Sequence, residues 1–228
     1  MKRSRRDWLV PLVLLLGLVA LTPMTSDSAL AQSEETELIP ELANEWDTGF
    51  ERSDLGNVAQ TAKIEYAEGN RALAQARKIR GRIAETEDPD KKSKLEAKLQ
   101  ETFQSAAKSF TDAIGYAPKM SEAYAGLGET LREWGQLEQS LEVYAAAVRR
   151  FPEDLENFEG WAMTLMELNM LGNATSTYTN YVEANPDRAA IMMEVMEDWL
   201  KRKKVDPGDL NPADVDRLAA WIQQQNAG

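Results

Sequence analysis

Apolar residues recur at helical spacing through the middle of the chain. One stripe comprises Ala72, Ala76, Ile79 and Ile83. A second stripe comprises Leu95, Leu99, Phe103, Ala106, Phe110 and Ala113. Steps of three and four residues place side chains on one face of an α-helix. The turn sequence Glu87-Asp88-Pro89-Asp90 separates the stripes, which predicts a hairpin of two long helices over residues 57–86 and 91–117.

A second pattern has a 34-residue period, which is set by the equally spaced prolines Pro118, Pro152 and Pro186. The residues between the prolines are in phase as well. The first segment contains Tyr124, Leu127, Gly128, Leu131, Ser140, Tyr144 and Ala147; the next contains Phe158, Trp161, Ala162, Leu165, Ala174, Tyr178 and Tyr181. Gly135 and Asn169 are separated by the same period. Both residue types tolerate a left-handed backbone, which predicts a tight turn between two helices at each position.

This pattern resembles the tetratricopeptide repeat, in which W-x2-L-G-x2-Y is followed by A-x3-F and then P. The resemblance is close over residues 121–154 and holds with substitutions over residues 155–188, whereas residues 87–120 match only the second half. It implies an all-α fold, a tetratricopeptide-repeat solenoid of stacked antiparallel helix pairs. The first unit, residues 57–120, is longer than one repeat, so we expect an elongated helical hairpin there.

Residues 189–228 are expected to close the C-terminal end of the solenoid. Residues 189–204 form an amphipathic pattern in the place of a capping helix. Asp206-Pro207-Gly208 breaks it, and Asn211 followed by Pro212 is typical of the start of a last helix. At the other end, residues 32–56 are acidic with few apolar residues, which predicts a loosely held leader.

Residues 1–31 have the pattern of an export signal. A basic start, MKRSRR, precedes an apolar stretch from Trp8 to Leu21, and Ala29-Leu30-Ala31 is a small-x-small cleavage site. This predicts a cleavable signal peptide and a mature chain in the periplasm or an equivalent lumenal space. An uncleaved anchor is the alternative, although a spanning helix needs about 20 apolar residues. Arg5-Arg6 also resembles a twin-arginine signature, so general secretion and twin-arginine export are both open.

The chain has no His and no Cys. This excludes thiol nucleophiles, disulfides, the Ser-His-Asp triad and the usual thiolate or imidazole metal sites. The sequence also lacks a Gly-rich phosphate loop. We therefore expect no catalytic activity, no metal site and no cofactor.

Charge is segregated along the chain, whose net charge is −12. Residues 71–108 hold ten bases and six acids, whereas residues 109–198 hold sixteen acids and five bases. The acidic balance argues against nucleic acid as a partner. The hairpin is predicted to form a basic arm comprising Arg77, Lys78, Arg80, Arg82, Lys91, Lys92, Lys94 and Lys98. Three interpretations stay open: solvated helix faces, contact with an acidic partner or a second copy, and contact with anionic lipid headgroups.

The resemblance implies that the first helix of each repeat lines a concave groove that receives a peptide or a partner helix. The corresponding positions are Glu122, Ala125, Glu129, Arg132, Glu133, Glu156, Glu159, Met163, Met166 and Glu167. The Lys, Asn and Arg clamp with which one subclass binds acidic tails is absent, since Ala125 and Glu129 stand at its first two positions. Charge complementarity favours a basic or amphipathic helical segment as the partner. The alternative is that these glutamates are only solvated.

Six of the nine methionines fall within residues 163–196. They are Met163, Met166, Met170, Met192, Met193 and Met196. The cluster is interpreted as core packing, as an adaptable binding surface, or as a thioether site for Cu(I).

These observations predict an exported, non-catalytic protein-binding scaffold, with an assembly or stability factor for an envelope or membrane complex as one hypothesis. The alternatives are self-association through the basic arm and attachment of the arm to a membrane surface. The partner, its pathway and the oligomeric state do not follow from the sequence.

Overall fold

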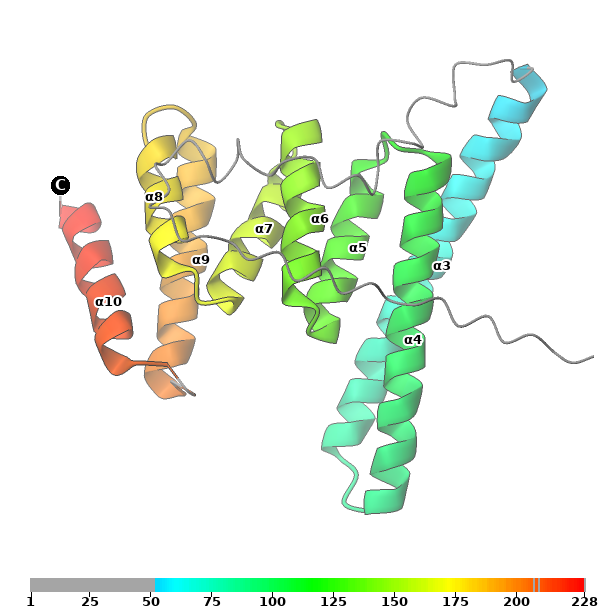
Figure 1. The fold of residues 1–228 in the computed structure, drawn as a ribbon, viewed down its shortest axis with the longest axis horizontal. Helices are drawn as coiled ribbons and strands as arrows, with labels where there is room; N and C mark the ends of the chain where they lie inside the picture. The colour runs from blue at the N-terminus through cyan, green and yellow to red at the C-terminus, as the bar shows by residue number, and fades with distance from the viewer. Residues whose placement is uncertain (1–51, 207, 209, 228) are drawn as a thin grey trace, which may run out of the picture. The chain divides into compact units, whose positions relative to one another are not determined.

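The computed structural model describes residues 52–206, 208 and 210–227. The predicted signal peptide and residues 32–51 of the predicted leader lie outside this range. Every regular element in the described range is an α-helix (Figure 1). The helices are α3 (Arg52–Ala84), α4 (Pro89–Tyr116), α5 (Ser121–Trp134), α6 (Leu137–Arg150), α7 (Leu155–Glu167), α8 (Leu171–Tyr181), α9 (Pro186–Val205) and α10 (Pro212–Ala227). The prediction of an all-α fold is confirmed for these residues. None of these helices is both long enough and apolar enough to cross a bilayer.

Helices α3 and α4 pack side by side as the predicted hairpin. Helix α4 begins at Pro89, two residues before the predicted start at residue 91. The Asp88 carboxylate sets this start by accepting hydrogen bonds from the backbone N–H groups of Asp90 (3.0 Å) and Lys91 (3.2 Å), and Pro89 occupies the first turn. Helix α3 starts at Arg52, inside the segment predicted as leader. Its first three residues, Arg-Ser-Asp, are all polar, so the apolar periodicity gave no signal for this start.

The next four helices follow the 34-residue period. Helices α5 and α7 begin at residues 121 and 155, and α6 and α8 begin at residues 137 and 171. Gly135, after α5, has φ 86°, and Asn169, after α7, has φ 57°. The predicted left-handed turns are therefore confirmed at both positions.

Helix α9 begins at Pro186, before the predicted start at residue 189. The Asn185 side chain caps it by accepting a hydrogen bond from the Arg188 backbone N–H at 3.2 Å, and proline is preorganised for the first helical turn. The third proline thus lies inside a helix, whereas Pro118 and Pro152 lie in the turns before α5 and α7. Asn211 accepts a hydrogen bond from the Ala213 backbone N–H at 3.1 Å, as expected for the start of α10.

Two aromatic rings lie between pairs of glycines from neighbouring helices. A Cβ atom at Gly69 of α3 or at Gly126 of α5 would lie less than 3.0 Å from the Phe110 ring of α4. Likewise, a Cβ atom at Gly128 of α5 or Gly160 of α7 would lie less than 3.0 Å from the Tyr144 ring of α6. Glycine is needed at these positions because each ring fills the space that a side chain would occupy.

Most of the buried apolar residues in the described part of the chain belong to two clusters. One joins the hairpin to α5 and includes Leu73, Phe103 and Phe110. The other extends from Tyr144 to Ile222. Met166, Met192 and Met196 are fully buried in the second cluster, and Met163, Met170 and Met193 pack against it. This packing supports core filling as the role of the methionine cluster.

Candidate functional site

The ten predicted groove residues lie on two helices in contact with each other. Five are on α5 and five are on α7. The 34-residue register places the two sets at equivalent positions of their helices. Only side chains that are accessible and not bound within the chain are available to a partner. The contacts of the described residues divide the seven charged side chains among the ten into three groups.

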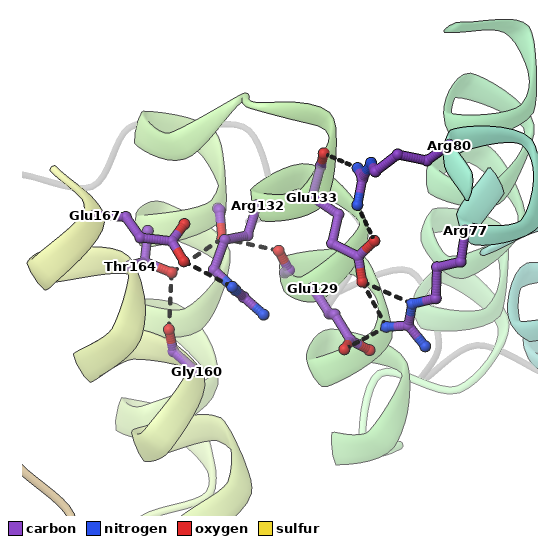
Figure 2. A network of polar contacts seen from close by, with 10 residues as sticks. Arg77, Arg80, Glu129, Arg132, Glu133, Gly160, Thr164 and Glu167 are labelled. Atoms are coloured by element: carbon purple, nitrogen blue, oxygen red, sulfur yellow. Dashed lines mark hydrogen bonds and ion pairs between the residues drawn. The ribbon is translucent and has the colours of Figure 1, made fainter. Parts of the chain in front are cut away.

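The first group, Glu129 and Glu133 of α5, is bound by two arginines of α3 (Figure 2). Arg77 Nε donates to Glu133 Oε1 at 2.7 Å, and Arg77 Nη2 lies 2.5 Å from Glu129 Oε1. Arg80 Nη1 lies 2.8 Å from Glu133 Oε2 and its Nη2 donates to the backbone carbonyl of Glu133. The hydrogen bond to Glu133 is the main reason why the pKa of Arg77 is raised above its usual value. We name this set of contacts the arm clamp.

The arm clamp joins two sets of residues that the sequence placed in different surfaces. Arg77 and Arg80 were predicted in the basic arm, and Glu129 and Glu133 in the groove. The Arg80 guanidinium also lies 5.2 Å from the centre of the Phe103 ring, a cation–π distance. The arm is therefore held against α5 of its own chain at this level.

The second group is the pair Arg132 and Glu167, whose Nη1 and Oε1 atoms are 2.8 Å apart (Figure 2). The two side chains are 16% and 30% exposed, so this pair is more enclosed than the arm clamp arginines, which are 46% and 44% exposed. The phenol of Tyr144 donates to the Ala125 carbonyl at 3.4 Å. Burial raises the pKa of Tyr144, against the lowering effect of Arg132.

The third group consists of Glu122, Glu156 and Glu159, for which the described residues provide no ion pair. All three are exposed. They lie close enough to interact: the pKa of Glu156 is raised first by the partial burial of its carboxylate and then by the charges of Asp154, Glu129, Glu159 and Glu122. We call Glu122, Glu156 and Glu159 the open acidic cluster.

Met166 is a correction to the predicted groove. Its side chain is 0% exposed and belongs to the core, whereas Met163 is partly exposed. Helix α7 contacts α5, α6, α8 and α9, so more than one of its faces is covered. The resemblance assigned Met166 to the groove by its position in the first helix of a repeat, but packing of α7 against four helices covers its side chain.

The remaining cations of the predicted arm are exposed, and no ion pair involves them in the described part of the chain. They are Lys78, Arg82, Lys91, Lys92, Lys94 and Lys98. Five acids, Glu85, Glu87, Asp88, Asp90 and Glu96, lie in the same stretch of sequence. With Arg77 and Arg80 neutralised by the clamp, the tip of the hairpin is nearly balanced in charge, which weakens the interpretation of the arm as a purely basic surface.

Metal-ligand clusters and clefts are the features of the described residues that bear on metal or cofactor binding. Among residues 52–206, 208 and 210–227, no group of three or more His, Cys, Asp or Glu is arranged to hold a metal ion. A cleft of about 420 Å³ between α8 and α10 is lined by Leu171, Leu218, Trp221 and the Asp214–Arg217 ion pair.

Comparison with protein-family models finds no match, and comparison with curated proteins finds none either.

Substituting Gln for Glu156 is expected to stabilise the protein slightly at neutral pH, within the ~0.5 kcal/mol typical of a surface change. The raised pKa means that the folded protein disfavours the charged form of Glu156. This penalty is present at pH 7 and disappears as the pH falls below the unfolded value of about 4.3. Thermal unfolding at pH 7 and pH 3 measures it. Glu138→Gln, an exposed residue on α6, is the control; a gain at pH 3 equal to that at pH 7 would contradict the argument.

Proposed function

We propose that this chain is a tetratricopeptide-type scaffold that binds a positively charged helical segment of another protein and carries out no chemistry. The observation that carries the proposal is the open acidic cluster, because two neighbouring helices bring three carboxylates together without a cation from the described part of the chain. Carboxylates placed this way are unfavourable to one another, and a cationic partner relieves that repulsion.

The helix geometry supports the tetratricopeptide assignment within this proposal. The 34-residue spacing of helix starts, the left-handed turns at Gly135 and Asn169, and the close approach of α5 to α6 at Gly128 are all features expected of such repeats. The export-signal pattern of residues 1–31 favours the periplasm or an equivalent lumenal space as the compartment of this binding activity. A role in assembling or stabilising an envelope complex is consistent with both the repeat-type helix geometry and the export-signal pattern.

The test uses a defined probe, an alanine-based helical peptide of about 17 residues with two arginines one turn apart, labelled for fluorescence anisotropy. Peptides of this length can be helical in water, and the probe isolates charge recognition from apolar contacts. Wild-type protein is expected to bind it with an affinity that falls as salt is added. Changing Glu122, Glu156 and Glu159 to Lys should weaken binding by at least about tenfold.

The matched control changes three exposed glutamates outside the cluster, Glu138, Glu142 and Glu183, to Lys. Both triple variants alter the net charge by the same amount. Equal losses in the two variants would show that only overall charge matters, and the proposal would fail. The proposal would also be wrong if the variant of Glu122, Glu156 and Glu159 bound the peptide as tightly as the wild-type protein does.

A further inference from the structure

The arm clamp places arginines on the same acidic surface that the proposed partner would use. Glu129 and Glu133 occupy positions of α5 in line with Glu122, and Glu129 also contributes to the charge felt by Glu156. Arginines of α3 therefore already occupy two of the predicted groove carboxylates, Glu129 and Glu133.

The occupant has a defined chemistry. Arg77 and Arg80 are three residues apart on α3, so their side chains leave the same face of the helix. Together they present guanidinium groups to both Glu133 oxygens, to Glu129 and to the Glu133 carbonyl. A planar guanidinium can donate two parallel hydrogen bonds, whereas a lysine ammonium acts as a point charge.

The arm clamp combines exposed arginines with an enclosed carboxylate. The two arginine side chains are 46% and 44% exposed, and ion pairs this exposed contribute little free energy. The Glu133 side chain, in contrast, is only 14% exposed. A carboxylate this enclosed is costly to leave without a cation, so departure of the arm requires another cation in its place.

We infer that Arg77 and Arg80 are an internal ligand of the acidic surface, and that the partner is a helix bearing two arginines one turn apart which displaces them. This inference rests on the proposed function and adds the chemistry and the regulation of the same surface. Partner binding is then coupled to release of the arm from α5. Free protein is held in a self-occupied state that lowers its affinity for weaker cationic segments.

The experiment compares wild type with the double variant Arg77→Gln/Arg80→Gln, using the arginine peptide described above. The double variant is expected to bind the peptide about threefold to tenfold more tightly, because the peptide no longer competes with the arm. Adding Glu133→Gln to the double variant should remove this gain. For a peptide with lysines in place of the arginines, the gain in affinity from wild type to the double variant should be smaller.

The matched control is Lys78→Gln/Arg82→Gln, which removes the same two charges from α3 but breaks no ion pair of the described residues. If this control gains as much affinity as the clamp variant, net charge is the cause and the inference is wrong. The inference is also wrong if the peptide binds wild type and the Arg77→Gln/Arg80→Gln variant equally well, or if it binds neither protein.

These outcomes separate the inference from the proposed function. Peptide binding that is lost in the Glu122, Glu156 and Glu159 variant, but unchanged by the clamp variant, leaves the function standing and removes the internal ligand. Circular dichroism of each variant checks the fold. Arg77→Lys/Arg80→Lys, which keeps the charges and loses the paired donors, is expected to show an intermediate gain and serves if the Gln variant is unstable.

Discussion

Replacing Gly160 with alanine is expected to lower the free energy of unfolding by up to about 2 kcal/mol, because it overpacks the contact between α6 and α7. The new Cβ would lie less than 3.0 Å from Cζ and Cε1 of Tyr144. Movement of the ring is restricted, because a Cβ at Gly128 of α5 would also lie less than 3.0 Å from it. Overpacking of this kind costs about 1–3 kcal/mol, more than the ~1 kcal/mol that alanine gains over glycine in a helix. Urea unfolding followed by circular dichroism gives the difference.

Gly81→Ala and Gly172→Ala are the controls for this prediction. Both glycines are in helices, α3 and α8, and a Cβ at either one would have no heavy atom within 4 Å. Each substitution is expected to stabilise the protein by about 0.4–1 kcal/mol, chiefly by restricting the unfolded chain. If Gly160→Ala stabilises the protein as much as the two control substitutions do, the prediction of overpacking between α6 and α7 at Tyr144 is wrong.

The helices were predictable because their signals are local. Apolar stripes, the Asp88-Pro89 start and the residues Gly135 and Asn169 each act over a few neighbouring positions. The sequence indicated only part of the two contacts in which an aromatic ring packs against glycines. The 34-residue pattern includes Gly128 and Tyr144. Gly126 and Gly160 are separated by the same period but lie outside the family pattern, so no signal in the sequence selected them.

The candidate site was less predictable because it depends on distant contacts. Arg77 and Glu133 are 56 residues apart, and nothing near either of them in sequence indicates the other. Their meeting depends on how the hairpin packs on α5, which Phe110 fixes between Gly69 and Gly126. The opposite charge of the two blocks was the available signal. It was interpreted as attraction between the basic arm and an acidic partner or a second copy, and not as contact with α5 of the same chain.

Arg188 illustrates the same limit. A charged residue in a helix pattern is normally assigned to the surface, yet Arg188 is 6% exposed. Its Nη2 donates to the Pro152 carbonyl at 2.6 Å, and its guanidinium lies 5.0 Å and 5.4 Å from the ring centres of Phe158 and Tyr181. Two aromatic rings and a carbonyl take the place of an acidic partner, a combination that only the tertiary structure reveals.

Substituting alanine for Phe110 is expected to have the largest effect, a loss of about 3–5 kcal/mol in the free energy of unfolding. The ring is 0% exposed and contacts α3 and α5 at once, so its removal leaves a cavity where three helices meet. Chemical denaturation of the variant and wild type gives the loss. Tyr116→Ala, at the end of the same helix and 42% exposed, is the control and should cost far less.

The Phe110 variant also tests how the core controls the site. Without the ring, α3 is no longer fixed against α5, and Arg77 and Arg80 lose the position that directs them to Glu129 and Glu133. At a temperature where the variant remains folded, the amide protons of α3 should exchange faster with solvent, and the arginine peptide should bind more tightly than to wild type. Faster exchange throughout α9 and α10 as well would indicate global loosening, and would argue against a local link between this core and the arm clamp.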